Sequence, residues 1–405
     1  MRGGQNKHEI TNMLESGTFE RDSVMTSITK KFALSDSTKN TLCHQFFEHY
    51  SRYLDKFDDI QLEFYPKNPD SSNPAPFIAV AGEGSTLQIV WFQKARLQMF
   101  IESFEFFQQS STKLEQFSAL DLFIMTLGKL VTTPNDQTNL KRHEKYMLEV
   151  HARCPDILDV SHKMLGLLLS STDRRLNKSS ILWYYDRKLL VLKNKDVVSP
   201  YFEQHMEHVC LKSAKNHFAN YYCWDTVRWI FDNESNDNNK RAIFVQVFQF
   251  CRSNFTDCSA WDTLAYFSKQ TSLESYSTYN RTSYKRIQRL LKLPVDAQGI
   301  SDQKLYWKNQ VLAINTAQEV MQMIRKLERA TTSIFNYLFA IATLIPRITF
   351  EAELSMFRNS LEAGILLDKS NGKSCENLVT LQQTEYFEQL KKFLGKLDQT
   401  QLPTN

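Results

Sequence analysis

The stretch KSAKNHFANYYCWDTVRWIFD, residues 212–232, decides the interpretation of the fold. It contains the end of one helix, a short polar corner at Asn220, and a second helix with Trp224 in its first turn. Asn, Asp, Ser and Thr at such a corner accept hydrogen bonds from the free N–H groups of the helix that follows. The stretch therefore predicts two helices joined as a hairpin.

Weaker copies of this corner lie on both sides of it. The aromatic residues that share the place in the first turn are Trp183, Trp224, Trp261 and Phe335. The polar residues four positions before them are Ser179, Asn220, Asp257 and Thr331. Successive aromatic residues lie 41, 37 and 74 positions apart, and 74 is twice 37. A period in the high thirties is typical of stacked helical hairpins, because each hairpin buries its apolar face against its neighbours.

The sequence thus predicts an all-α fold, an alpha-alpha superhelix of stacked hairpins. We expect a flexible N-terminus over 1–36, a mostly helical region over 37–150, the repeats over 155–345 and capping helices over 346–405. Two interpretations stay open for residues 77–92, which form either a short β-hairpin or a turn leading into a long helix. Only 11 Gly and 10 Pro among 405 residues argue against a fold dominated by strands and loops.

Composition narrows the class of protein. The net charge of +4 is too small to suggest nucleic-acid binding. Seven Cys, an odd number without a CxxC pair, indicate reduced thiols. The longest apolar run, 334–345, is shorter than the roughly 20 residues that a membrane span needs. We therefore expect a cytoplasmic protein without integral membrane association.

Three local patterns suggest binding chemistry, and each has a plainer interpretation. The stretch AGEGST, residues 81–86, lacks the Lys-Ser/Thr ending of a phosphate-binding loop. His205, His208 and Cys210 share one helix but have no fourth ligand at suitable spacing, so no metal is expected in this chain. The basic stretch SYKRIQRLLKL, residues 283–293, is interpreted as a solvated helix face, with an acidic partner or a membrane surface as the alternative.

Arg187 and Arg228 each follow their Trp by four residues, one helical turn along the same face. A guanidinium at this place can bond the adjacent hairpin or point into a groove. The four repeat aromatics are expected to pack between hairpins, where removal of a buried Trp costs about 3–5 kcal/mol.

The motif NYYCWDTVRWIF from Asn220 resembles the alpha-subunit repeat of protein prenyltransferases, Asn-Tyr-x-x-Trp followed by Arg. The resemblance covers about residues 155–345, and the Arg here falls at the fourth rather than the third place after Trp. The long N-terminal extension and degraded repeats look like the divergent alpha-subunit repeat-containing members of that family. Tetratricopeptide arrays are the competing interpretation, but they repeat every 34 residues.

The resemblance implies an alpha-like subunit of a heterodimeric protein geranylgeranyltransferase, inactive without its partner. That partner would be a beta subunit of the Rab geranylgeranyltransferase type, which would carry a zinc ion. Geranylgeranyl diphosphate would be the co-substrate, and the acceptor would be an already prenylated protein such as a SNARE. The alternative from another class is a non-catalytic helical-repeat adaptor.

The resemblance also implies roles for single residues. Lys178, five positions before Trp183, matches the lysine that faces the isoprenoid diphosphate, where a fixed ammonium would stabilise the charge growing on the leaving group. The family's Asn-Tyr after that lysine is Ser179-Ser180 here. The residues implied in substrate or interface binding are Asn220, Tyr221, Arg187 and Arg228.

Overall fold

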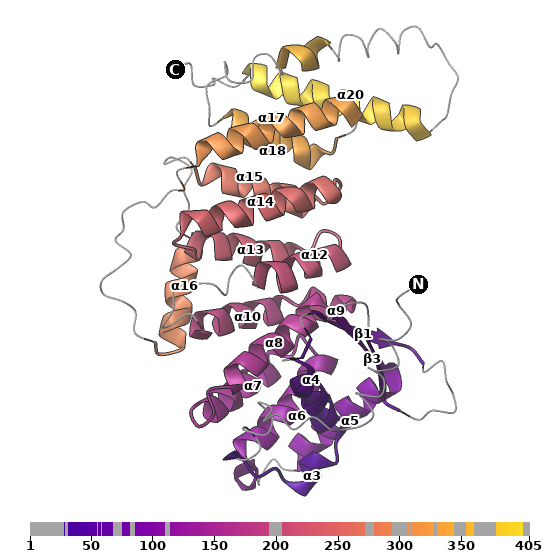
Figure 1. Ribbon diagram of the computed structural model, residues 1–405, viewed down its shortest axis with the longest axis vertical. Coiled ribbons are helices and arrows are strands. Elements are labelled where there is room, and N and C mark those ends of the chain that lie inside the picture. The colour runs from indigo at the N-terminus through magenta and orange to yellow at the C-terminus, as the bar shows by residue number, and fades with distance from the viewer. Residues whose placement is uncertain are drawn as a thin grey trace, which may run out of the picture. The chain divides into compact units, whose positions relative to one another are not determined.

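The chain forms two compact units, residues 1–217 and 218–405, and each is treated by itself. The computed structural model describes residues 28, 31–54, 56–57, 59–67, 75–81, 86–109, 114–193, 205–271, 279–293, 307, 309–327, 330–343, 354–359 and 378–399. Helices dominate this part of the chain, and one small sheet accompanies them (Figure 1). The all-α expectation therefore holds broadly.

Unit 1 contains the sheet and a series of helices. Its elements are α3 (Asp36–Lys39), α4 (Leu42–Tyr53), β1 (Asp59–Tyr65), β2 (Phe77–Ala81), β3 (Thr86–Phe92), α5 (Gln93–Gln109), the 3-10 helix η1 (Leu114–Gln116), α6 (Ala119–Thr132), α7 (Gln137–His151), α8 (Ile157–Ser170), α9 (Arg174–Asn177), α10 (Ser180–Lys193), the π-helix η2 (Met206–Leu211) and α12 (Lys212–Asn216).

The sheet has the order β1-β3-β2, with β2 antiparallel and β1 parallel to β3. The antiparallel pair confirms the β-hairpin interpretation of residues 77–92, in the register Phe77 opposite Trp91 and Ala81 opposite Leu87. Strand β1 was not expected, although its sequence DIQLEFY alternates apolar and polar residues as a half-buried strand does. The turn at 82–85, most of 1–36 and much of 346–405 lie outside the described residues.

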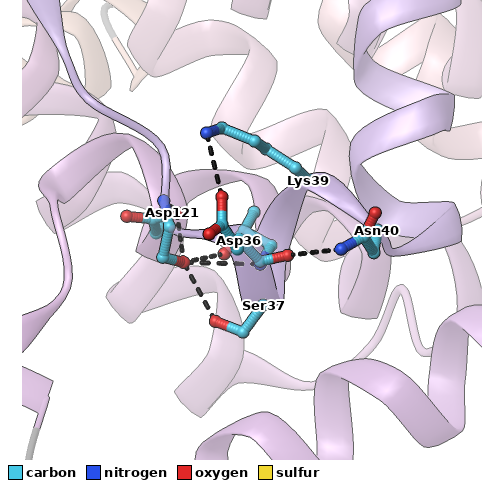
Figure 2. Close-up of polar contacts among 7 residues, drawn as sticks. Asp36, Ser37, Lys39, Asn40 and Asp121 are labelled. Atoms are coloured by element: carbon cyan, nitrogen blue, oxygen red, sulfur yellow. Dashed lines mark hydrogen bonds and ion pairs between the residues drawn. The ribbon is translucent and has the colours of Figure 1, made fainter.

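One buried carboxylate holds two helix N-termini of unit 1 together. Asp121 Oδ2 accepts bonds from the backbone N–H and the hydroxyl of Ser118, which completes a capping box at the start of α6. Its other oxygen accepts bonds from the backbone N–H and the hydroxyl of Ser35, the N-cap of α3, each at 3.0 Å. Within α3, Lys39 pairs with Asp36 at 3.1 Å (Figure 2). Helices α3 and α6 therefore begin at one shared polar point.

Three of the four predicted capping corners are confirmed, whereas Thr331 makes no side-chain capping bond to α18. The four repeat aromatics are the fourth residues of their helices α10, α13, α15 and α18, and all are buried. The side chains of Ser179, Asn220 and Asp257 cap the first three of these helices, at 3.3, 3.4 and 3.0 Å. The indole N–H groups of Trp183 and Trp261 each donate to the backbone carbonyl six residues earlier, at 2.7 and 2.9 Å.

Unit 2 is a stack of helices. Its elements are α13 (Tyr221–Asn233), α14 (Asp237–Ser253), α15 (Cys258–Lys269), α16 (Tyr279–Leu290), α17 (Gln310–Leu327), α18 (Thr332–Ala342) and α20 (Leu378–Gln399). Helices α13, α15, α18 and α20 pack on one another in this order, while α14 packs on α15 and α17 on α18 (Figure 1). Rings join the layers: Phe231 stacks on Phe267 at 4.0 Å, and Trp261 lies 5.8 Å from Tyr337.

None of the helices in the described ranges is both long enough and apolar enough to cross a membrane.

Candidate metal centre

Three side chains from three helices meet in the interior of unit 1. They are His162 of α8, Asp186 of α10 and His205, which directly precedes η2. Their exposed fractions are 8, 0 and 3%. His162 Nε2 lies 3.6 Å from Asp186 Oδ1, and His205 Nε2 lies 2.9 Å from Asp186 Oδ2. In the described part of the chain, these residues form the group whose donor atoms, all within 4.8 Å of one another, could hold a metal ion.

The hairpin of α8 and α10 brings His162 level with Asp186. His162 lies eight residues before the end of α8, and Asp186 lies six residues after the start of α10. At about 1.5 Å per residue, these places are about 12 and 9 Å from the turn. A second contact farther from the turn shows the same antiparallel alignment, because Lys193 pairs with Asp159 at 2.7 Å.

His205, the third residue of the group, lies on a helix that runs parallel to α8. The rings of His162 and His205 stack with centroids 5.0 Å apart and planes at 20°. Four residues on in both helices, Gly166 faces Val209, and a Cβ at Gly166 would lie 2.9 Å from the Val209 Cγ2 atom. The missing side chain at Gly166 therefore allows η2 to approach α8 closely enough for the two imidazoles to meet.

The helix that carries His205 is irregular at this point. Residues 206–211 form a single π-helical segment, and α12 follows it directly. Such segments are rare and occur frequently at functional sites, because one extra residue in the turn redirects the side chains around it. His205 lies at the boundary where this wider turn begins.

Five of the six polar side-chain atoms of the group lack hydrogen-bond partners. Those that are buried without a hydrogen bond are His162 Nε2, both Asp186 carboxylate oxygens and both His205 ring nitrogens. The 2.9 Å approach of His205 to Asp186 is thus not aligned as a hydrogen bond. A buried polar atom without a partner costs about 1–3 kcal/mol, and a buried unpaired charge costs more. Because such groups are rare in folded proteins, five in one place require an explanation, and a bound ion is one of those known.

A divalent transition metal fits this donor set. Imidazole nitrogen and carboxylate oxygen are ordinary zinc ligands, with bonds of about 2.0–2.2 Å. Donor atoms around a tetrahedral zinc ion are then about 3.3 Å apart, a value between the two contacts that Asp186 makes. Burial lowers the pKa of His162, and the charges of His205, Lys193 and Lys163 lower it further. The neutral imidazole that results is the form that binds a metal.

The residues singled out from sequence lie elsewhere. In unit 1, Lys178 is the half-buried C-cap residue of α9, and its charge lowers the pKa of His217 after the larger effect of burial. Arg187 is half-buried on α10, next to Asp186 in the chain. The diphosphate contact of Lys178 and the binding role of Arg187 stay predictions of the resemblance.

In unit 2, α13 brings three of the singled-out residues together. Asn220 is the buried N-cap, whereas Tyr221 is 59% exposed. The Arg228 guanidinium lies 5.6 Å from the Tyr221 ring centre and 5.9 Å from that of Tyr266 on α15. Arg228 therefore lies beside an aromatic ring of α15, and the binding roles of Asn220, Tyr221 and Arg228 stay predictions.

The sequence identified one of the three residues of the metal group, but grouped it with residues that lie elsewhere. His205 was grouped with His208 and Cys210, but His208 is exposed and neither residue belongs to the group. His162 and Asp186 were not singled out at all.

A signal for Asp186 was present in the sequence. It lies on the apolar stripe of α10, between Leu182 one turn before and Leu190 one turn after, where a carboxylate is unexpected. Such a residue needs a partner, although the sequence does not show which one.

Comparisons with known proteins point to one family. The ECM9 N-terminal domain model matches residues 36–170, and the ECM9 middle domain model matches residues 182–291. Together the two matches span more than half of the chain. Protein ECM9 of Saccharomyces cerevisiae is 31% identical over 260 residues, which are 62% of this chain and 66% of the yeast protein. The chain thus spans just under two thirds of the length of that relative.

These matches correct the expectations that rested on the resemblance. Assignment to the prenyltransferase alpha-subunit family is wrong, and so are the geranylgeranyltransferase function and the beta-subunit and prenylated SNARE partners. The reason lies in the motif. A capping Asn followed by a Trp in the first turn meets the packing needs of any helical-hairpin corner, so the pattern identifies a structure and no chemistry.

Proposed function

We propose that this chain, which matches two ECM9 domain models, is a helical-repeat adaptor braced by one buried divalent metal ion. The observation that carries the proposal is the set of five buried, unpartnered donor atoms on His162, Asp186 and His205. Zinc is the first choice, because it accepts imidazole and carboxylate ligands and needs no redox chemistry. The proposal differs from the sequence-based expectation, which assigned no metal ligand to this chain.

The ion would act as a structural brace. Burial of all three ligands keeps substrates away from the metal, which favours a role in folding over one in catalysis. His162 and Asp186 belong to one hairpin, and His205 belongs to the helix that follows it. A repeat array depends on contacts between neighbouring hairpins, so an ion at this junction would strengthen the kind of contact that holds such arrays together. The layered packing of α13, α15 and α18 supports a superhelix of stacked hairpins.

An adaptor role has support on the surface of unit 2. Phe218, Tyr221 and Tyr222 are 59, 59 and 40% exposed, and aromatic side chains are enriched at protein interfaces. We place the protein in the cytoplasm, since the cysteines of the described residues are free thiols and most of them are buried.

Metal analysis of the purified full-length chain tests the proposal. We expect close to one zinc ion per chain after dialysis against metal-free buffer, and loss of that ion in His162→Ala and His205→Ala. His143→Asn is the matched control, because His143 is another buried histidine of unit 1 and lies outside the group. Its Nδ1 contacts the Thr126 hydroxyl at 3.0 Å, a contact that an Asn amide can reproduce. A folded wild-type chain without affinity for zinc at micromolar concentration would exclude the brace.

A further inference from the structure

Helices α18 and α20 of unit 2 pack directly on each other (Figure 1). A groove lies between them. Its volume is about 480 Å³, within the range of sites that hold small organic ligands. It lies in a different unit from the metal centre, so what it binds is independent of the proposed brace.

The floor of the groove is aromatic. Phe335 and Phe339 lie one turn apart on α18, and Phe393 faces them from α20. The rings of Phe335 and Phe393 are 5.3 Å apart between centroids. Phe339 is half-buried and offers part of its ring to a hydrocarbon chain, whereas Phe335 and Phe393 are 4 and 3% exposed and form the base beneath it. Each CH₂ group that becomes buried contributes about 0.8 kcal/mol.

The rim of the groove is cationic. Lys392 and Lys396 are both exposed and lie one turn apart on α20, and Lys396 Nζ lies 6.0 Å from the Phe339 ring centre. The remaining polar residues of the lining are uncharged, namely Thr332, Asn336, Gln389 and Gln399. Among the described residues, none of those that line the groove is a carboxylate. Two acidic residues of α20 lie next to the lining: Glu388 is exposed and lies one turn before Lys392, and Asp398 pairs with Arg358 at 3.0 Å.

We propose that the groove binds an amphiphile with a single apolar chain and an anionic head group. The chain lies on the three Phe rings, and the head group lies between Lys392 and Lys396. An ammonium group held close to an anion forms a charge-assisted hydrogen bond, which is stronger than one between neutral groups. A cationic head group of the same size meets two like charges at this rim and is rejected.

Gly395 makes it possible to close the groove without disturbing the fold. It lines the groove, and a Cβ placed there meets no atom within 4 Å. A side chain at this position therefore has room to enter the space that a ligand would occupy. Replacing a helical Gly also favours the helix, by up to about 1 kcal/mol. Gly395→Phe is thus expected to fold and to lose the site.

Isothermal titration of the full-length chain with 12-carbon probes below their micelle concentrations tests the proposal. Dodecanoate and dodecyl phosphate distinguish a carboxylate from a phosphate head group. Dodecyltrimethylammonium carries the same chain with the opposite charge, and butanoate carries the head group with almost no chain. We expect one dodecanoate or dodecyl phosphate per chain, at least tenfold weaker binding of the ammonium compound, and no binding of butanoate.

Variants then locate the site. Lys392→Gln combined with Lys396→Gln should weaken anion binding about tenfold and strengthen binding of the ammonium probe, because the like charges that reject it are gone. Gly395→Phe should abolish binding of every 12-carbon probe. Lys391→Gln is the matched control, because Lys391 is an exposed lysine of α20 outside the lining. The proposal is overturned if neither anion binds at millimolar concentration, if the ammonium probe binds equally well, or if Gly395→Phe binds as the wild type does.

Discussion

Replacing Asp186 by Asn should have opposite consequences in the metal-free and the metal-loaded protein. In the metal-free chain the Asp186 carboxylate is fully buried and makes no hydrogen bond, so it costs more than the 1–3 kcal/mol of a neutral group left without a partner. An amide of the same shape removes that charge. The free energy of unfolding of the metal-free variant should therefore equal or exceed that of the wild type.

In the presence of zinc, the wild type should be more stable than Asp186→Asn. Free zinc at about 100 times its dissociation constant stabilises the wild-type fold by about 2.7 kcal/mol. For a unit of the size of residues 1–217, each kcal/mol raises the melting temperature by about 2–4 °C. The wild type should thus gain about 5–11 °C on addition of zinc, and Asp186→Asn should gain almost nothing, since an amide oxygen is a weak zinc ligand.

Thermal unfolding of the full-length chain in chelator and in zinc measures both effects. Asp159→Asn is the control, because Asp159 also lies on the α8–α10 hairpin but is 60% exposed and pairs with Lys193. It should keep the whole zinc-dependent shift. The reasoning is refuted if zinc leaves the wild type unchanged while Asp186→Asn is strongly destabilised in chelator. These two results together would mean that a protonated histidine, and not a metal ion, balances the charge of the Asp186 carboxylate.

Three further predictions concern packing and charge. Gly166→Ala should lower the free energy of unfolding by about 1–3 kcal/mol in urea denaturation. Adding Val209→Ala to the same chain should recover part of this loss, because it removes the methyl group that the new Cβ meets. If the losses of the two single variants simply add in the double variant, the close contact is contradicted. Trp261→Phe should lower the free energy of unfolding by about 1–3 kcal/mol more than Trp224→Phe does, because the Trp261 indole N–H donates a hydrogen bond and the Trp224 indole N–H does not. Equal losses of stability in the two variants would contradict this reason. Burial raises the pKa of Asp232 from 3.8 to about 6. The protonated carboxyl therefore contributes about 3 kcal/mol to the free energy of unfolding below about pH 4. This contribution is lost as the pH rises through 6. Asp232→Asn should remove this slope from denaturation curves recorded between pH 4 and 7, and an unchanged slope would assign it to other groups.

Much of the helical organisation could be predicted because its signals are local. Helices α10 and α13 begin directly after the predicted corner residues Ser179 and Asn220. A capping side chain bonds a backbone N–H group two or three residues away, and an apolar stripe repeats within one or two turns. Both features are contained in a short window of sequence.

The elements that were missed show where such signals fail. Helix α7 has the sequence QTNLKRHEKYMLEVH, which is largely polar and was not singled out as a helix within the mostly helical region expected over 37–150. Strand β1 pairs in parallel with a strand that begins more than twenty residues after it ends, and no short window contains that partner. In both cases burial against distant segments decides the structure.

The amino-acid sequence by itself determined where the hairpin corners lie, because a cap and the aromatic residue behind it act within a single turn of helix. It did not determine which polar residues on the apolar stripes would meet. His162, Asp186 and His205 are separated by 24 and 19 positions and come from three helices. Only the antiparallel alignment of α8 with α10 and the close approach of η2 at Gly166 bring them together, because that proximity arises from packing between helices.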